Sequence, residues 1–167
     1  MSKNTVTTKN QNRTDRPGFS VVIPTYNGKK LLQTYLPAVL EELKTGDELI
    51  IADDASTDDT KNWFDTWILD QPKFKNHEIT VVFLHNPQNL RFAATVNKAS
   101  EKATNDFMLL LNNDVVPRPR LLNSLWEYWQ ENQNTTESKN NLFAVGCLEY
   151  EQHSLSEPPT LGGKNRL

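Results

Sequence analysis

Carboxylates and amides follow three short apolar segments of this sequence, each at the point where a buried strand would end. They stand in PTYN (24–27), DDAS (53–56) and NND (112–114). Each group alone could be a turn or a helix cap, because Asp, Asn and Ser satisfy free N–H groups at helix starts. Together they supply three carboxylates, several amides and one tyrosine, and repulsion among the carboxylates favours a bound cation or a donor-rich ligand.

The elements expected to position these groups alternate between strands and helices. Buried strands are indicated by apolar runs near residues 19–24, 48–53, 79–84, 107–111 and 142–150. Continuous apolar strands joined by helices are typical of a parallel sheet, so we predict an α/β, Rossmann-like, mostly parallel sheet with helices on both faces. Ligands of such sheets bind beyond the carboxyl ends of the strands, which is where the polar segments would meet.

Two local signals concern the helices. Pro37 lies inside the first helical pattern and predicts either a kink or two short helices. Ser56, with Asp59 three residues later, has the capping-box pattern and predicts that the second helix opens at Ser56.

The composition is that of an ordinary globular domain. The chain has 167 residues, 37% of them hydrophobic, and a net charge of −3. Its basic residues are scattered, which argues against nucleic-acid binding, and it has no apolar run long enough for a transmembrane segment. Residues 1–17 are polar, lack the apolar core of a secretory signal and are predicted to be a disordered leader. We predict one domain over 18–150, a loop over 151–167, and a cytoplasmic location, with the inner face of the membrane as an alternative.

Several common ligand sites are not supported by the sequence. It contains no P-loop, no glycine-rich dinucleotide turn after the first strand, and no histidines at metal-ligand spacing. One or two carboxylates at a strand end suit Mg²⁺ or Mn²⁺ bridging a diphosphate, and an Asp at another strand end suits a ring N–H. These features indicate a nucleotide-diphosphate site built without a glycine loop.

Four sequence blocks carry a resemblance to a known family. They are VVIPTYNG (21–28), ELIIADDASTDDT (48–60), NLRFAATVNKA (89–99) and DFMLLLNNDVVP (106–117). In order and spacing they resemble the nucleotide-binding half of family 2 inverting glycosyltransferases with the GT-A fold. The resemblance extends from about Phe19 to Gly146.

The resemblance implies which residues bind the nucleotide sugar. They are Pro24, Thr25, Tyr26, Asn27, Asp54, Arg91 and Asn113. Tyr26 would flank the base, and Asp54 would accept a hydrogen bond from a pyrimidine N3–H. Arg91 stands where many relatives carry Gly, and it could either reach the diphosphate or lie on the helix surface.

The resemblance also implies a metal ligand. Asp114 would be the last residue of the family's metal motif and would contact Mg²⁺ or Mn²⁺ on the diphosphate. Asn112 stands where the first acid of that motif usually is, so this chain brings one charge fewer to the cation.

The implied activity is transfer of a sugar, with inversion, from a nucleotide-diphosphate sugar to a hydroxyl of a saccharide or lipid-linked acceptor. Only 53 residues follow Asp114, and none of their acids stands in a context like the family's general base. We therefore predict that the chain is truncated and lacks the base, with Glu149 or Glu151 the first candidates otherwise. One alternative is a non-catalytic nucleotide-sugar-binding module. A less favoured one is a phosphoacceptor receiver domain, whose acidic pair would follow the first strand.

Overall fold

A computed structural model describes residues 16–133, 144, 150–151 and 160–161 of the chain. It divides into two compact units, residues 1–123 and 124–167. The predicted domain end near residue 150 stays a prediction, because little of the chain beyond residue 133 is described. The predicted end of the disordered leader, at residue 17, is too late in the sequence. Arg16 is only 4% exposed, so the folded domain includes residues 16 and 17.

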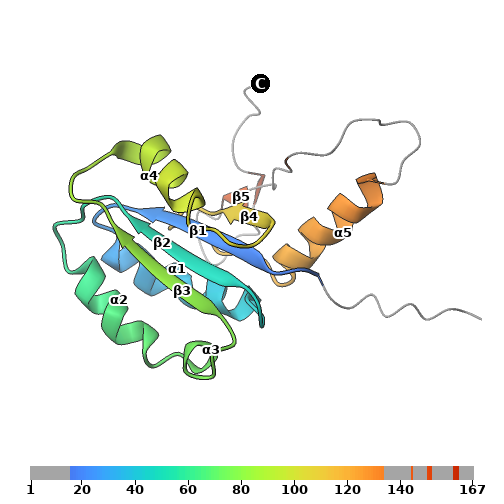
Figure 1. Cartoon of the computed structure of the whole chain (residues 1–167), viewed down its shortest axis with the longest axis horizontal. Helices are drawn as coiled ribbons and strands as arrows, with labels where there is room; N and C mark the ends of the chain where they lie inside the picture. Colours follow the sequence, from blue (N-terminus) through green and yellow to red (C-terminus); the bar gives the residue numbers. More distant parts are fainter. Residues whose placement is uncertain (1–15, 134–143, 145–149, 152–159, 162–167) are drawn as a thin grey trace, which may run out of the picture. The chain divides into compact units, whose positions relative to one another are not determined.

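Four parallel strands form the sheet of the first unit, in the order β3-β2-β1-β4 (Figure 1). They are β1 (Phe19–Thr25), β2 (Glu48–Asp53), β3 (Thr80–His85) and β4 (Phe107–Leu110). Each begins and ends within one residue of the apolar run that predicted it, and the predicted parallel α/β fold is confirmed. The chain moves outward from β1 to β3 and then returns to place β4 on the other side of β1.

Helices connect these strands. They are α1 (Lys29–Glu42), α2 (Thr60–Ile68), α3 (Pro72–Lys75), α4 (Arg91–Ser100) and, after β4, α5 (Leu121–Gln133). Of the two alternatives for Pro37, the division into two short helices is wrong, because α1 continues through Pro37, and the kink stays a prediction. The predicted capping box is also wrong: Ser56 lies four residues before α2, and its hydroxyl donates to Asp53.

Helices cover both faces of the sheet, as predicted. Val22 and Ile50 point to one face, where they form a buried cluster with Ala99 of α4. Phe83 of β3 points to the opposite face and meets Phe64 of α2, with ring centroids 5.0 Å apart. Helix α2 contacts α1, and Figure 1 shows α1 behind the strands. Right-handed crossovers account for this division, because the return from β3 to β4 runs opposite to the steps from β1 to β3.

A buried ion pair fixes the chain just before β1. Arg16 Nη1 and Nη2 lie 2.7 and 2.6 Å from the two carboxylate oxygens of Asp47. The same carboxylate accepts hydrogen bonds from the backbone N–H groups of Phe19 (2.8 Å) and Lys44 (2.7 Å). Asp47 therefore joins the start of β1 to the loop that leads into β2.

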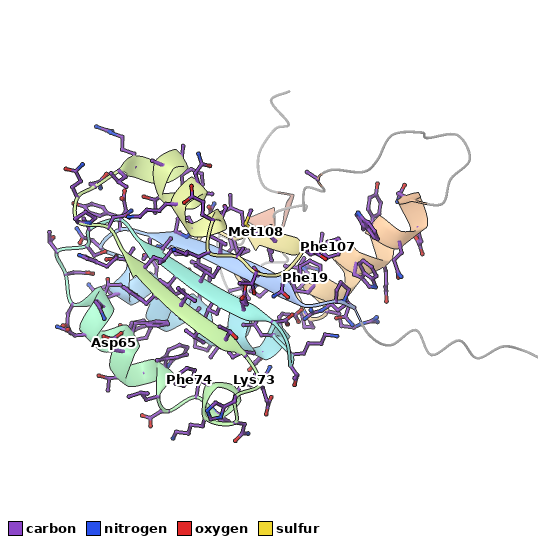
Figure 2. All side chains as sticks on the ribbon, viewed as in Figure 1. Phe19, Asp65, Lys73, Phe74, Phe107 and Met108 are labelled. Atoms are coloured by element: carbon purple, nitrogen blue, oxygen red, sulfur yellow. The ribbon has the colours of Figure 1, made fainter. Side chains whose placement is uncertain are left out.

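Two other contacts join elements that are distant in the sequence. The rings of Phe19 and Phe107 pair across β1 and β4, with centroids 5.4 Å apart (Figure 2). The Lys73 ammonium of α3 donates to the carbonyl oxygens of Leu40 and Glu41, at 2.7 and 3.1 Å, and so satisfies free carbonyls at the end of α1.

The second unit contains a short antiparallel pair, β5 (Tyr150–Glu151) and β6 (Thr160–Leu161). The strand β6 lies within the stretch predicted to be a loop. The predicted strand over 142–150 falls mostly outside the described residues. In the described part of α5, the rings of Trp126 and Trp129 stack with centroids 5.0 Å apart.

Candidate functional site

A pocket of about 340 Å³ opens at the carboxyl ends of β1, β2 and β4. Its lining residues are Pro24, Thr25, Tyr26, Leu31, Asp54, Phe92, Thr95, Asn112, Asn113 and Asp114. The pocket lies where the strand order reverses between β1 and β4, which is the usual ligand position in an open α/β sheet. The three polar segments noted in the sequence do meet there.

Most of the residues expected to bind a nucleotide sugar line this pocket, and two do not. Asn27 instead joins the turn after β1 to the loop after β2, because its side-chain oxygen accepts from the N–H groups of Thr57 (2.7 Å) and Asp58 (3.2 Å). Arg91 is the first residue of α4 and is exposed outside the pocket lining. Their contacts with a nucleotide stay predictions.

Asp54 is the most enclosed acid of the pocket, with 6% of its surface exposed. Its Oδ1 accepts from the N–H of Leu90 (2.7 Å), the hydroxyl of Thr95 (2.7 Å) and the amide of Asn86 (3.1 Å). Its Oδ2 accepts from the N–H of Arg91 at 2.8 Å. Asp54, which directly follows β2, therefore caps the start of α4, and the N-terminus of that helix stabilises the negative charge of the carboxylate.

These hydrogen bonds keep Asp54 ionised. Burial raises the pKa of Asp54, but the hydrogen bonds from Leu90, Thr95, Asn86 and Arg91 outweigh it and leave the pKa below its usual value. Oδ1 already holds three donors, whereas Oδ2 holds one and has room for another. A base N–H that reaches this residue would therefore have to approach Oδ2.

The neighbouring acid, Asp53, has a different task. It is fully buried and accepts from the backbone N–H of Ser56 at 3.3 Å, while His85 Nδ1 lies 2.6 Å from its Oδ2. Asp53 is not among the pocket-lining residues. The two acids of the pair thus face different surroundings, one fixing the loop after β2 and the other lining the pocket.

Close packing at Gly28 holds two pocket-lining side chains, Thr25 and Asn113, next to each other. A Cβ at this position would lie 1.9 Å from Thr25 Oγ1 and 2.8 Å from Asn113 Nδ2. These two side chains are themselves hydrogen-bonded, with Asn113 Nδ2 donating to Thr25 Oγ1 at 2.9 Å. Only glycine leaves room for this contact between the ends of β1 and β4.

Arg91 adopts a backbone conformation that favours glycine, with φ of 66°. This matches the expectation that many relatives carry Gly here. The strain of an ordinary residue in this region is about 1–2 kcal/mol, and it is tolerated where the Arg91 N–H donates to Asp54.

Sequence reasoning missed four residues of the site: Leu31, Phe92, Thr95 and Asn86. A usable signal existed for two of them. Phe92 and Thr95 are three residues apart near the start of a helix, so they lie on the same side of it. Nothing in the sequence around Asn86 indicated its contact with Asp54.

A cation at this pocket would have few protein ligands. Asn112 and Asp114 line the pocket and are exposed. Among the described residues, no group of three or more His, Cys, Asp or Glu side chains could hold a metal. Mg²⁺ and Mn²⁺ commonly bind one or two carboxylates together with phosphate oxygens and water. The residues present therefore fit a cation that binds with a diphosphate.

Within the part of the chain that the structure covers, no helix has the length and apolar character needed to cross a membrane.

Known proteins share this fold and sequence pattern. TuaG of Bacillus subtilis (strain 168), named as a teichuronic acid biosynthesis glycosyltransferase, is 33% identical over 99 residues, which are 59% of this chain and 36% of TuaG. The mannosyltransferase PcManGT from Pyrobaculum calidifontis, solved in complex with GDP-Man and Mn²⁺, has a TM-score of 0.59 at 24% identity, covering 68% of this chain and 33% of that one. S. aureus TarS 1-349 in complex with UDP-GlcNAc has a TM-score of 0.58 at 23% identity, covering 70% and 32%.

This chain thus spans about a third of the length of those proteins. The sequence profile of glycosyl transferase family 2 matches residues 20–140, which is more than half of the chain and includes every pocket residue. The match rules out the receiver-domain alternative. With its parallel sheet in the order 3-2-1-4 and its pocket at the point of reversal, the chain belongs to glycosyl transferase family 2 and has the GT-A fold.

Proposed function

We propose that this chain binds the nucleotide-diphosphate part of a sugar donor, as the donor-binding part of a metal-assisted, inverting glycosyltransferase. The observation that carries the proposal is the pocket at the point of strand reversal. It combines an ionised Asp54, which caps α4, with an exposed Asp114. The relatives named above support it, because their names and bound ligands concern sugar transfer and nucleotide sugars.

The spacing of the two acids suits an extended ligand. Asp54 follows β2 and Asp114 follows β4, with β1 between them. Two strand spacings separate their strands by roughly 10 Å. A nucleoside diphosphate lying across the end of β1 would place its base near Asp54 and its diphosphate near Asp114.

A divalent cation, Mg²⁺ or Mn²⁺, would be held by Asp114, with Asn112 as a second oxygen donor. When bound, such a cation stabilises negative charge on the departing diphosphate. Asp54 would accept from the base through Oδ2, Asn113 and Thr25 would line the middle of the pocket, and Tyr26 would flank the base. We assign no general base to this chain. The acceptor would be a hydroxyl of a saccharide or a lipid-linked sugar on the cytoplasmic side of a membrane.

Titration calorimetry tests the proposal directly. The 167-residue chain should bind at least one of UDP, GDP and TDP, more tightly with Mn²⁺ than without. Replacing Asp54 by Asn should weaken binding by roughly 1–3 kcal/mol, because a buried donor on the base loses a charged acceptor. The control is Asp65→Asn, which changes an exposed carboxylate on α2. No binding of any nucleotide by the unsubstituted chain would refute the proposal.

A module that binds a nucleotide sugar without transferring the sugar is the second candidate. The amide of Asn112, which offers the cation no charge, favours it. Release of free nucleotide from a radiolabelled donor, with and without a mixed saccharide acceptor, tests this candidate. Turnover that depends on the acceptor would exclude the module, whereas binding without turnover is expected of both candidates, because no general base is assigned to this chain.

A further inference from the structure

We infer that Phe92, together with Tyr26 and Leu31, forms an apolar wall against which the flat face of the nucleobase packs, so that Phe92 contributes to the affinity for the nucleotide. The inference rests on the proposed function and adds a residue to it. Phe92 lines the pocket but carries no polar group, so neither charge nor hydrogen bonding explains its presence there.

Exposed apolar side chains gather in this pocket. Tyr26, Leu31 and Phe92 are 51%, 40% and 56% exposed, and they are three of the eight exposed large hydrophobic side chains in the described residues. They come from the turn directly after β1, the first turn of α1 and the first turn of α4. Single exposed apolar residues are ordinary, but several within one pocket mark a surface that a ligand covers.

The backbone that carries Phe92 is held in place on both sides. The two preceding N–H groups, of Leu90 and Arg91, donate to Asp54, and the hydroxyl of Thr95 in the next turn donates to the same carboxylate. A side chain mounted on a fixed turn loses less freedom when a ligand packs on it, so it contributes more to affinity.

The chemistry of the two ends of the pocket indicates which part of the ligand Phe92 meets. The end at Asn112 and Asp114 is polar and suits a cation and a diphosphate. The end at Asp54 carries Phe92, on the turn of α4 that Asp54 caps, beside an acceptor, Oδ2, that has room for one more donor. Within a nucleotide sugar, the base alone combines a flat π face with ring N–H groups.

Binding measurements on the full chain test the inference. Phe92→Ala should weaken the UDP, GDP or TDP complex that the unsubstituted chain forms by roughly 5- to 100-fold, the range expected for the loss of one base–aromatic contact. The affinity for inorganic pyrophosphate with Mn²⁺ should not change, because pyrophosphate has no base. Phe92→Tyr and Phe92→Trp should restore nucleotide affinity, since each keeps a ring.

The matched control is Leu69→Ala, which removes a 58% exposed apolar side chain that does not line the pocket. Unchanged nucleotide affinity in Phe92→Ala, or an equal loss for pyrophosphate, would overturn the inference while leaving the proposed function standing. Failure of the unsubstituted chain to bind any of the three nucleotides would overturn both. Melting temperatures of all variants identify any loss of folding, which is not expected for an exposed residue.

Discussion

The two ends of the pocket differ in how much of each the fold builds by itself. At one end, Asp54 is enclosed and accepts four hydrogen bonds, two of them from the backbone N–H groups at the start of α4. At the other, Asp114 is exposed after β4, and among the described residues it has too few acidic neighbours to form a metal site from protein ligands alone. The Asp54 end is part of the folded structure, whereas in our proposal the Asp114 end is completed by a cation and a diphosphate.

This difference makes a general prediction. Substitutions at the Asp54 end should lower both stability and binding, and substitutions at the Asp114 end should lower binding alone. The experiments below test that contrast, beginning with the largest expected effect.

The largest effect is expected from Asp54→Ala. The change removes the acceptor of four donors: the side chains of Asn86 and Thr95 and two backbone N–H groups at the start of α4. We therefore expect the free energy of unfolding to fall by about 2–4 kcal/mol. Urea denaturation monitored by circular dichroism measures this. Asp65→Ala, on the exposed face of α2, should change stability by no more than about 0.5 kcal/mol. Equal stability of the two variants would show that Asp54 does not cap α4.

Gly28→Ala should have the next largest effect. Its new methyl group would collide with the Thr25 hydroxyl and displace Asn113, at a cost of roughly 1–3 kcal/mol, the usual range for overpacking. Removing the obstructing hydroxyl and methyl in the double variant Thr25→Ala/Gly28→Ala should recover part of the loss, because the two positions are in contact. Simple additivity of the two substitutions in urea denaturation would argue against the collision.

These two predictions also show what the sequence could and could not reveal. The strands and the positions of Asp54 and Asp114 were predictable, because apolar runs mark buried strands and parallel strands end at one edge. The partners of Asp54 were not, since Asn86 and Thr95 lie 32 and 41 residues further along the chain. The capping box failed for a local reason instead: the hydroxyl of Ser56 donates to Asp53, three residues earlier at the end of β2. Likewise, Arg16 is polar and precedes β1, and its burial is explained by distant partners, chiefly Asp47, 31 residues further along the chain.

Asp114→Ala should affect binding without affecting stability. Loss of a carboxylate ligand should weaken Mn²⁺-dependent nucleotide binding by at least about tenfold, the lower range for changes around a metal. Binding without Mn²⁺ and the free energy of unfolding should change little. Asp106→Ala removes another exposed carboxylate, just before β4 at the opposite end of the strand, and is the control. A large loss of stability in Asp114→Ala would contradict the contrast between the two ends.

Acid should destabilise the chain through its buried carboxylates. Burial raises the pKa of Glu48, but hydrogen bonds from Ser20 and Thr104 outweigh it, and the net pKa is lowered, as it is for Asp54. A folded pKa below the unfolded values of 4.5 and 3.8 means that the stabilisation is complete above those values. It is lost as the pH falls through them towards the folded pKa values.

The contribution of these two groups to the unfolding free energy should therefore be complete and independent of pH between pH 8 and about pH 5.5, and it should decline below about pH 4.5. Glu48→Gln and Asp54→Asn should each weaken this acid dependence, because each removes one titrating group. The same slope in the unsubstituted chain and in both variants would show that the enclosed carboxylates do not govern acid unfolding.

The smallest effect is expected at Arg91, whose backbone N–H donates to Asp54 while its side chain is exposed. Its φ of 66° favours glycine, so Arg91→Gly should relieve backbone strain, offset in part by the greater freedom of glycine in the unfolded chain. The net change in stability should lie within about 1 kcal/mol and favour folding, while Arg91→Ala, which keeps the strain, should bring no gain. Nucleotide affinity then separates the two roles considered for this side chain. A loss in both variants that shrinks at high salt would place the guanidinium on the diphosphate, and unchanged affinity would place it on the helix surface.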